Sequence, residues 1–367
     1  MVVFKVRVIL VVGTRPQIIK SAPIIRAAEK YKDIKLMVVH TGQHYDYEMS
    51  KVFFNELELP DPVINIGVGS GSHGSQTGRM IIELEGVFLR LKPNLVLVPG
   101  DTNSTLAAAL AAVKLQIPVA HVESGARSYD MTMPEEINRR LTDHCSNILF
   151  TVSENCSQNL KVEGITEDKI VLVGDTMYES IKQHLCDIEK DKGLEELGVN
   201  AKEYSILTIH RPENVDDPIK LKSILKAVCE LDDVIIFPIH PRTKERLIGL
   251  GLYEKISRKL KISAPISYYR MLNLIKNAKC VLTDSGGIQK EAFWLKTPCV
   301  TLRSRTEWVE TVELEANILC GEPRLIKDAY KKMVKKFILN VSVNPFDFGG
   351  ASQKIIRHLI SSTPQIT

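Results

Sequence analysis

The chain has 367 residues, of which 44% are hydrophobic and 25% are charged, a composition typical of globular proteins. Its length exceeds the size at which a single hydrophobic core stops growing, so we expect two domains. The net charge of +4 is mild, and no zinc-finger or RNA-binding aromatic pattern occurs. These features argue against a nucleic-acid partner and suit a small anionic ligand better.

The cysteines form no CxxC pair and lie mostly in apolar stretches, which indicates buried thiols in a reducing compartment. They are Cys145, Cys156, Cys186, Cys229, Cys280, Cys299 and Cys320. The apolar run at the start of the chain is interrupted by Lys5 and Arg7, so we interpret it as a core strand and not as a signal peptide or a membrane span. We therefore expect a cytoplasmic protein without a membrane partner.

In chain order, short β-branched runs alternate with helical patterns. In the first half the expected strands are Val6 to Val12, Leu36 to His40, Leu95 to Val98, Val119 to Val122, Ile148 to Val152 and Ile170 to Val173. In the second half they are Ile206 to Ile209, Val234 to Ile239, Cys280 to Thr283, Cys299 to Leu302 and Ile318 to Cys320. This alternation predicts an α/β fold with parallel, doubly wound sheets.

We expect two Rossmann-like domains, residues 1–175 and 176–350, with the ligand in a cleft between them. The charged stretch Asp187 to Glu203 has no strong apolar pattern and is predicted to be a linker. A last helical pattern, within 351–367, could pack back on the first domain.

The first strand ends in GTRPQIIK, Gly13 to Lys20. Thr14 can cap the following helix and Pro16 suits its first turn. Arg15 could face an anion at the helix N-terminus, or it could be an ordinary surface arginine.

A GxGxxG pattern occurs at Gly69, Gly71 and Gly74, but it follows no convincing strand and is not the first βα turn of either half. We therefore reject it as a dinucleotide site and expect a mobile loop that could close over a ligand.

Three carboxylates are predicted to reach the carboxyl edge of one sheet. Asp101 follows a strand and precedes an alanine-rich helix, Glu123 follows the strand 119–122, and Glu135 comes after Pro134 at a helix start. In isolation Asp101 would be a helix cap, and Glu135 with Glu136 could merely stabilise a helix N-terminus. Together the three carboxylates suit proton transfer.

In the second half, His210-Arg211 and His240-Arg242 follow consecutive strands and would make one edge of that sheet cationic. Ser285-Gly286-Gly287 follows another strand at a helix start, where backbone N–H groups can approach phosphate oxygens. Glu291, on the same helix, could accept ribose hydroxyls, although the small residues could also be only a turn. No residue cluster has the spacing of a metal site, so we expect neither metal nor cofactor.

The motifs GTRPQIIK, TGQHYD, PGDTNSTLAAALAA, HVESGARS, MPEEINRR, IHRPEN and LTDSGGIQKEA span nearly the whole chain. Taken together they closely resemble the non-hydrolysing UDP-N-acetylglucosamine 2-epimerase family. The resemblance implies two Rossmann-like domains in the GT-B arrangement, a homodimer, and interconversion of UDP-N-acetylglucosamine and UDP-N-acetylmannosamine. The reaction would proceed by elimination of UDP to 2-acetamidoglucal and re-addition with inversion at carbon 2.

The same resemblance implies roles for individual residues. The catalytic group would be Asp101, Glu123, Glu135 and His210. The substrate-binding group would be Arg15, Lys20, Arg139, Met271, Ser285, Gly286, Gly287, Glu291 and Arg305. A regulatory UDP-N-acetylglucosamine would touch Gln43, Glu136, Arg211 and His240. The chain departs from the family at Trp308, where relatives often read TERPE, and at Met271, where they often carry an aromatic residue.

Three other functions stay open. A GT-B glycosyltransferase would need an acceptor and would give no epimer. A hydrolysing epimerase would release free N-acetylmannosamine and UDP. A non-catalytic sensor of nucleotide sugars would keep the glycine-rich helix start but would have no use for three carboxylates.

Overall fold

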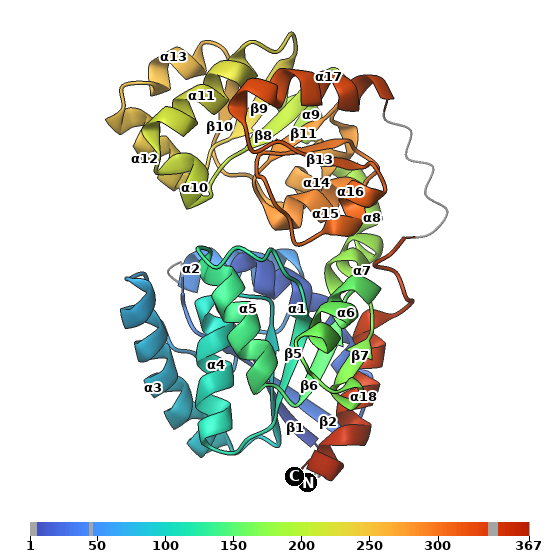
Figure 1. The fold of residues 1–367 in the computed structure, drawn as a ribbon. Helices are drawn as coiled ribbons and strands as arrows, with labels where there is room; N and C mark the ends of the chain where they lie inside the picture. Colours follow the sequence, from blue (N-terminus) through green and yellow to red (C-terminus); the bar gives the residue numbers. More distant parts are fainter. Residues whose placement is uncertain (1–5, 44–46, 337–343, 367) are drawn as a thin grey trace. The chain divides into compact units, whose positions relative to one another are not determined.

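The computed structural model describes residues 6–43, 47–336 and 344–366. The chain divides into two compact units, unit 1 (Met1–Gln183 and Val343–Thr367) and unit 2 (His184–Ser342). Each unit is a parallel sheet covered by helices, so the α/β prediction with two Rossmann-like parts is confirmed (Figure 1).

Unit 1 contains a seven-stranded sheet in the order β3-β2-β1-β4-β5-β6-β7, and all its strand pairs are parallel. The strands are β1 (Val6–Val12), β2 (Ile34–His40), β3 (Ile64–Asn65), β4 (Leu95–Pro99), β5 (Val119–Ser124), β6 (Ile148–Thr151) and β7 (Ile170–Leu172). The strand order reverses between β1 and β4. In open α/β sheets this switch point is where ligands bind, at the carboxyl ends of the strands.

The helices of unit 1 are α1 (Arg15–Ala28), α2 (Tyr47–Glu56), α3 (His73–Leu91), α4 (Asn103–Lys114), α5 (Pro134–Cys145), α6 (Glu154–Val162), η1 (Glu167–Lys169), α7 (Thr176–Gln183) and α18 (Ala351–Ile366). One buried cluster joins α3 and α4 to the sheet, and it includes Phe88, Ala108 and alternate residues of β1, Ile9 and Val11. Helices α1 and α18 also pack against the sheet, and they pack against each other.

Unit 2 contains a six-stranded parallel sheet in the order β10-β9-β8-β11-β12-β13. The strands are β8 (Tyr204–Thr208), β9 (Val234–Pro238), β10 (Lys261–Ser263), β11 (Val281–Thr283), β12 (Cys299–Thr301) and β13 (Asn317–Leu319). The helices are α8 (Leu185–Lys190), α9 (Gly193–Leu197), α10 (Pro212–Val215), α11 (Pro218–Cys229), α12 (Pro241–Gly249), α13 (Tyr253–Ser257), α14 (Tyr268–Asn277), α15 (Gly286–Trp294), α16 (Val309–Glu313), η2 (Pro323–Leu325) and α17 (Ile326–Lys336). Its switch point lies between β8 and β11.

The predicted strands are all present, but β3 and β10 were not predicted. Both are edge strands of two or three residues, and neither has the apolar run that marks an inner strand. The opposite edge strands, β7 and β13, keep a short apolar run and were predicted, so it is the absence of that run that hides β3 and β10.

The prediction that residues 187–203 form a linker is wrong. These residues contain α8 and α9, which pack on α14 in unit 2. Arg270 Nη1 of α14 lies 2.7 Å from Glu196 Oε2, and Asn273 Nδ2 donates to the Ile188 carbonyl at 2.7 Å. Charged residues that suggested a linker, such as Glu196, thus form ion pairs with the neighbouring helix α14.

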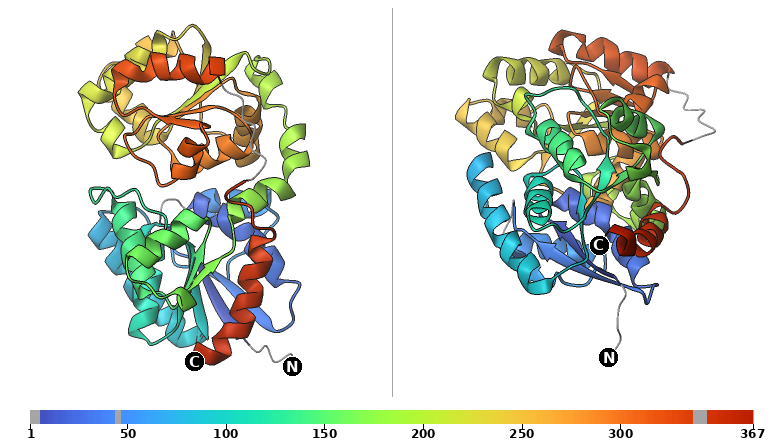
Figure 2. Two further views of the ribbon diagram at one scale, coloured as in Figure 1. Left: turned by 45° about the vertical axis from the view of Figure 1, so that its right-hand side comes forward. Right: turned by 60° about the horizontal axis from the view of Figure 1, so that its bottom comes forward.

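The helix α18 returns to unit 1, as all views in Figures 1 and 2 show. Ser352 donates from both N and Oγ to the Glu179 carboxylate of α7, at 2.8 and 2.7 Å. Ile355 and Leu359 are fully buried. The contacts of α7 with α1 and α18 place α7 in unit 1, so the division between the units follows Gln183 and not residue 175.

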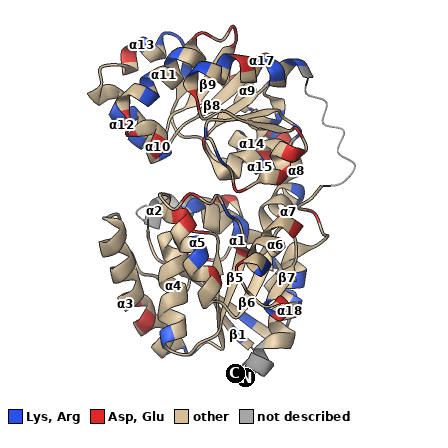
Figure 3. Cartoon of the chain, viewed as in Figure 1, with Lys and Arg blue, Asp and Glu red and all other residues tan. Residues whose placement is uncertain are grey.

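In the view of Figure 3, Lys and Arg residues are spread over the helices of both units and are interspersed with Asp and Glu. On α17, for example, Lys327, Lys331, Lys332 and Lys335 are exposed, while Tyr330 and Met333 are buried in the core. Within the described ranges, no helix combines the length and the apolar character needed to cross a membrane.

Candidate active site

Two of the predicted carboxylates lie at the ends of adjacent strands next to the switch point of unit 1. Asp101 follows β4 in the turn to α4, and Glu123 is the next-to-last residue of β5. The two strands pair directly, with Val98 opposite His121. The sequence therefore predicted correctly that Asp101 and Glu123 share one edge of a sheet.

Glu123 has a strained backbone. Its φ is +68°, a conformation that side-chain-bearing residues rarely adopt, and the register of β5 against β6 shifts between Val122 and Ser124. Glu123 is only 6% exposed, and its Oε1 lies 2.6 Å from Lys20 Nζ of α1. Strained residues of this kind persist where the surroundings impose them, and they cluster at functional sites.

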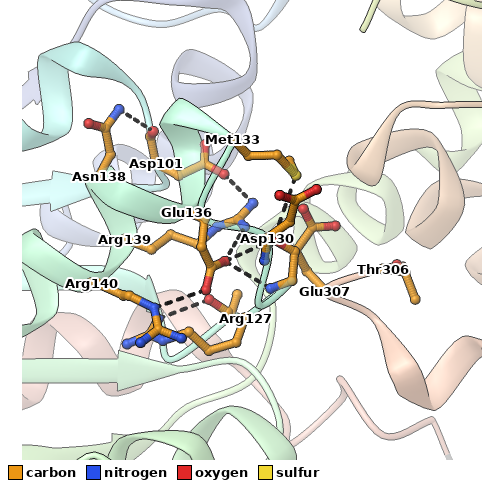
Figure 4. A network of polar contacts seen from close by, with 12 residues as sticks. Asp101, Arg127, Asp130, Met133, Glu136, Asn138, Arg139, Arg140, Thr306 and Glu307 are labelled. Carbon is orange, nitrogen blue, oxygen red and sulfur yellow. Dashed lines mark hydrogen bonds and ion pairs between the residues drawn. The ribbon is translucent and has the colours of Figure 1, made fainter. Parts of the chain in front are cut away.

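Asp101 is held by an arginine from α5. Arg139 Nη2 lies 2.6 Å from Asp101 Oδ2, and Asn138 Nδ2 donates to the Asp101 carbonyl at 3.0 Å (Figure 4). The expectation that Asp101 caps α4 is wrong, because Thr102 caps that helix in a reciprocal pair with Thr105. The carboxylate of Asp101 therefore does not cap α4, and it pairs with Arg139 instead.

Helix α5 presents Glu135 and Glu136 in its first turn, but the two differ in burial. Glu136 is fully buried, and its carboxylate accepts from Ser128 N and Oγ at 2.8 and 3.0 Å and from the guanidinium groups of Arg139 and Arg140 at 3.2 Å each (Figure 4). Glu135 is half-buried. Glu136 therefore anchors the loop before α5, and Glu135 is the more accessible carboxylate.

The first turn of α1 supplies cations. Thr14 occupies the N-cap position without a capping hydrogen bond from its side chain, so the predicted cap is wrong. Gln17 Oε1 accepts from Gly13 N instead, at 2.9 Å. Arg15 is half-buried, with its guanidinium 4.9 Å from the ring centroid of Phe53. Lys20, by contrast, reaches the carboxylate of Glu123.

The loop after β2 contributes Gln43, whose side-chain oxygen accepts from Ser104 N and Oγ at 2.9 and 2.7 Å. Gln43 is 4% exposed. Its predicted contact with a regulatory ligand stays a prediction. The rejected GxGxxG segment runs from the loop after β3 into the first turn of α3, so it is not the first βα turn of either unit.

In unit 2, a buried aspartate holds the predicted histidine. Asp284 follows β11 and is fully buried, and its Oδ1 lies 3.0 Å from His210 Nδ1. Its carboxylate also accepts from the backbone N of His210 and of Arg211 and from Asn214 Nδ2, at 3.0–3.1 Å. Burial alone would raise the pKa of Asp284, but His210 and these donors hold it below the usual value.

Asp284 was missed as a site residue although it stands inside the LTDSGG motif. The signal that could have identified it is a carboxylate at a strand end, opposite another strand that ends in a histidine. The two histidines predicted at equivalent strand ends do come together, since the ring centroids of His210 and His240 are 5.8 Å apart. Arg211 is half-buried beside them, and His240 is exposed.

The glycine-rich helix start is formed as predicted. Ser285 caps α15 by accepting from Ile288 N at 3.5 Å. A Cβ at Gly286 would lie 3.3 Å from Trp308 Nε1, so a larger residue would crowd this turn. Glu291 is 5% exposed on the same helix. Gly287 is half-buried in the first turn.

A buried group of charges and rings supports this turn and was also missed. Lys290 Nζ lies 3.8 Å from the ring centroid of Trp308, and Arg303 pairs with Glu307 at 3.1 Å. All four side chains are at most 3% exposed. Of the remaining predicted substrate contacts, Met271 is half-buried on α14 and Arg305 is exposed in the loop before α16. In the part of the chain that the structure describes, no group of three or more His, Cys, Asp and Glu side chains could hold a metal ion.

Comparison with known proteins gives one consistent result. The family model described as UDP-N-acetylglucosamine 2-epimerase matches residues 26–360. The UDP-N-acetylglucosamine 2-epimerase of Methanocaldococcus jannaschii is 49% identical over 361 residues, which cover 95% of this chain and 98% of the relative. The UDP-2,3-diacetamido-2,3-dideoxy-D-glucuronate 2-epimerase of Pseudomonas aeruginosa is 42% identical over 362 residues, 96% of this chain and 99% of the relative.

Among solved structures, the Methanocaldococcus jannaschii UDP-GlcNAc 2-epimerase in complex with UDP-GlcNAc and UDP superposes with a TM-score of 0.91. It is 48% identical, and the superposition covers 97% of this chain and 99% of that chain. The likeness extends through both units.

Proposed function

Because the chain belongs to the UDP-N-acetylglucosamine 2-epimerase family, a family of isomerases, we propose that it interconverts UDP-N-acetylglucosamine and UDP-N-acetylmannosamine without hydrolysis. The observation that carries the proposal is the arrangement of Glu123 beside Lys20 and Asp101 beside Arg139 at the ends of adjacent strands. Inversion of carbon 2 requires a base on one face of the sugar ring and an acid on the other. Two oriented carboxylates can supply both.

The proposed reaction begins with cleavage of the bond between carbon 1 and the UDP oxygen. The proton on carbon 2 is not acidic by itself, but positive charge developing at carbon 1 loosens it. When a carboxylate takes that proton, the electron pair of the C–H bond becomes the C1=C2 double bond of 2-acetamidoglucal. UDP then adds back to carbon 1 while a proton arrives at carbon 2 from the opposite face, so no water is consumed.

In unit 1, we assign the two proton transfers to Asp101 and Glu123, and a supporting role to Glu135 on α5. The strained backbone of Glu123 and its 2.6 Å contact with Lys20 support this assignment, because the geometry fixes where the carboxylate points. Lys20, Arg139 and Arg15 are proposed to contact the substrate as cations.

We assign the binding of UDP to groups of unit 2. Backbone N–H groups at Ser285-Gly286-Gly287 and the dipole of α15 favour phosphate oxygens. His210 Nδ1 lies 3.0 Å from the Asp284 carboxylate, which orients the ring, and in its imidazolium form the ring would donate from Nε2 to the leaving diphosphate. Glu291 is proposed to bind ribose hydroxyls, and Met271 and Arg305 to contact the rest of the nucleotide.

The experiment that tests this proposal is NMR of UDP-N-acetylglucosamine incubated with the protein in deuterated water. We expect deuterium at carbon 2 and accumulation of UDP-N-acetylmannosamine. Free N-acetylmannosamine with UDP would instead establish a hydrolysing epimerase. Absence of deuterium exchange would contradict both epimerases and favour a glycosyltransferase or a sensor.

A second candidate substrate is UDP-2,3-diacetamido-2,3-dideoxy-D-glucuronate. It is favoured by the Pseudomonas aeruginosa relative, whose identity of 42% exceeds the 31% of the Bacillus subtilis UDP-N-acetylglucosamine 2-epimerase. The same elimination would serve, since both sugars carry an acetamido group at carbon 2. Comparison of kcat/KM for the two nucleotide sugars decides between them. A kcat/KM more than about 10²-fold higher for one of them would identify it as the substrate that the site recognises by polar contacts.

We also propose regulation by a second UDP-N-acetylglucosamine, with Gln43, Glu136, Arg211 and His240 as contacts. The exposed ring of His240 and the half-buried Arg211 support it better than Gln43 and Glu136, which are nearly or fully buried. The test is the reverse reaction, which should start only after a trace of UDP-N-acetylglucosamine is added. A full rate of the reverse reaction without added UDP-N-acetylglucosamine would contradict this proposal.

A homodimer is proposed from exposed apolar side chains on α3 and α5. Ile82 and Leu89 are 71% and 57% exposed, and Ile137 and Leu141 are 38% and 47% exposed. Light scattering should give twice the mass of one chain, and Ile82→Lys with Leu89→Lys should shift it toward the monomer.

A further inference from the structure

A buried ionic cluster of unit 1 has no part in the reaction described above. His121 of β5, Asp143 of α5 and Arg127 of the intervening loop are each at most 1% exposed. His121 Nδ1 lies 2.6 Å from Asp143 Oδ1, and Arg127 Nη2 lies 2.7 Å from Asp143 Oδ2. Arg127 also pairs with Glu163 at 2.7 Å. Two potential cations thus face two carboxylates.

The hydrogen bonds of His121 determine its protonation state. Its Nε2 lies 2.7 Å from the carbonyl oxygen of Gly100, which can only accept, so Nε2 must carry a hydrogen. Its Nδ1 faces a carboxylate oxygen of Asp143. That carboxylate also accepts from Arg127 and from Gly125 N at 3.1 Å, an arrangement that favours the ionised acid. Both ring nitrogens of His121 therefore face acceptors, an arrangement that an imidazolium satisfies.

The cluster reaches the two turns that carry the proposed catalytic carboxylates. His121 binds the carbonyl of Gly100, directly before Asp101, and Asp143 binds the N–H of Gly125, two residues after Glu123. Gly100 and Gly125 have φ of +68° and +77°, which glycine adopts without steric cost, and because glycine is flexible the contacts from neighbouring elements help to fix both turns. A Cβ at Gly125 would lie 2.2 Å from the Cys156 carbonyl oxygen, so this turn has no room to shift.

We propose that His121, held as an imidazolium between the Gly100 carbonyl and the Asp143 carboxylate, is a positioning residue that, through Asp143, sets the spacing between Asp101 and Glu123. The proposal rests on the function proposed for these two carboxylates. Displacement of one catalytic group by about 1 Å can lower a rate about 10²-fold, so a residue that touches no substrate can control turnover.

The first test observes the proton directly. In protein labelled with ¹⁵N-histidine, assigned by loss of the signal in His121→Gln, both ring nitrogens of His121 should resonate as protonated at about pH 8, above the ordinary pKa of histidine. A neutral ring at that pH overturns the proposal. This readout does not depend on epimerase activity, so it separates failure of the inference from failure of the proposed function.

The second test is kinetic. His121→Gln should lower kcat about 10²-fold while the KM for UDP-N-acetylglucosamine and the affinity for UDP change little. The matched control is His144→Gln on α5, whose half-exposed ring lies 3.5 Å from Glu163 at the edge of the same cluster, and which should keep the wild-type kcat. A folded His121→Gln protein with unchanged kcat overturns the positioning role. An equal loss in both variants also overturns it.

Discussion

The sites of the two units are held by different kinds of contact. In unit 1, Glu123 and Asp101 are each fixed by the side chain of a cation from another element, Lys20 and Arg139. In unit 2, Asp284 accepts from two backbone N–H groups, and the proposed phosphate site is the backbone at the start of α15. The side chains proposed to exchange protons are thus oriented by other side chains, whereas the proposed anion site is built from the backbone.

The largest expected effect is in unit 1. Glu123→Gln keeps the size of the side chain but removes the proton acceptor, so kcat should fall about 10³-fold. The affinity for UDP, measured by calorimetry, should stay at the wild-type value because the proposed UDP contacts belong to unit 2. Glu154→Gln, an exposed change on α6, serves as the control. Full turnover in Glu123→Gln would remove this residue from the mechanism.

The next effect concerns Asp284, which accepts from the backbone N–H groups of His210 and Arg211 in unit 2. Asp284→Asn replaces an acceptor of several N–H groups by an amide that is itself a donor, so the free energy of unfolding should fall by about 2–3 kcal/mol. Binding of UDP should weaken as well, because His210 loses its partner. Urea unfolding and calorimetry measure the two changes.

The control for Asp284 is Asp217→Asn, at the exposed cap of α11, where asparagine caps as well as aspartate. Its stability should change by less than about 0.5 kcal/mol. Equal stability of both variants would show that the buried carboxylate does not support the site.

A smaller effect is expected at the helix start itself. Gly286→Ala adds a Cβ 3.3 Å from Trp308 Nε1, which crowds the backbone that a phosphate would approach, so the affinity for UDP should fall about tenfold. The comparison is Gly78→Ala in α3, where a Cβ meets nothing within 4 Å and should stabilise the helix by about 0.5–1 kcal/mol. Unchanged UDP affinity in Gly286→Ala would count against the phosphate site.

The smallest effect is a pH dependence of the stability of unit 1. Burial lowers the pKa of His358 on α18, so the unfolded chain takes up a proton more readily than the folded one. The stability linked to His358 is therefore present above the unfolded pKa of about 6.5 and is lost as the pH falls below it. His358→Phe retains the edge contact with Phe150 and should reduce the loss of stability between about pH 7.5 and 5.5. An identical pH slope in the variant would exclude His358 as the cause.

The inner strands could be predicted because burial on both faces of a parallel sheet leaves continuous apolar runs, as in Val6 to Val12. The edge strands β3 and β10 could not, since they lack an apolar run. The short helices α8 and α9 could not either, since their region is charged and is held by partners such as Arg270. The same limit applied to capping. Thr102 and Asp101 are adjacent and both can cap, and only the fold determines which one does.

The positions of Asp101, Glu123 and His210 at strand ends could be predicted, because a single residue type after a strand was informative, and their roles stay predictions. The contacts of Asp284 and His121 could not be predicted, because they depend on groups that the fold brings from other elements. A buried charge is informative only when its partners are known, and the partners of Asp284 lie 70 or more residues away in sequence. The strain at Glu123 is likewise a property of the folded backbone alone.

The return of α18 to unit 1 means that unit 2 is inserted between two parts of the chain that form one body. During synthesis the ribosome completes unit 2 before it releases the helix that covers α1 and β1. Until then, the surface that buries Ile355 and Leu359 stays open to solvent and to chaperones. Maturation of unit 1 should therefore wait for unit 2, even though the strands of unit 1 are translated first.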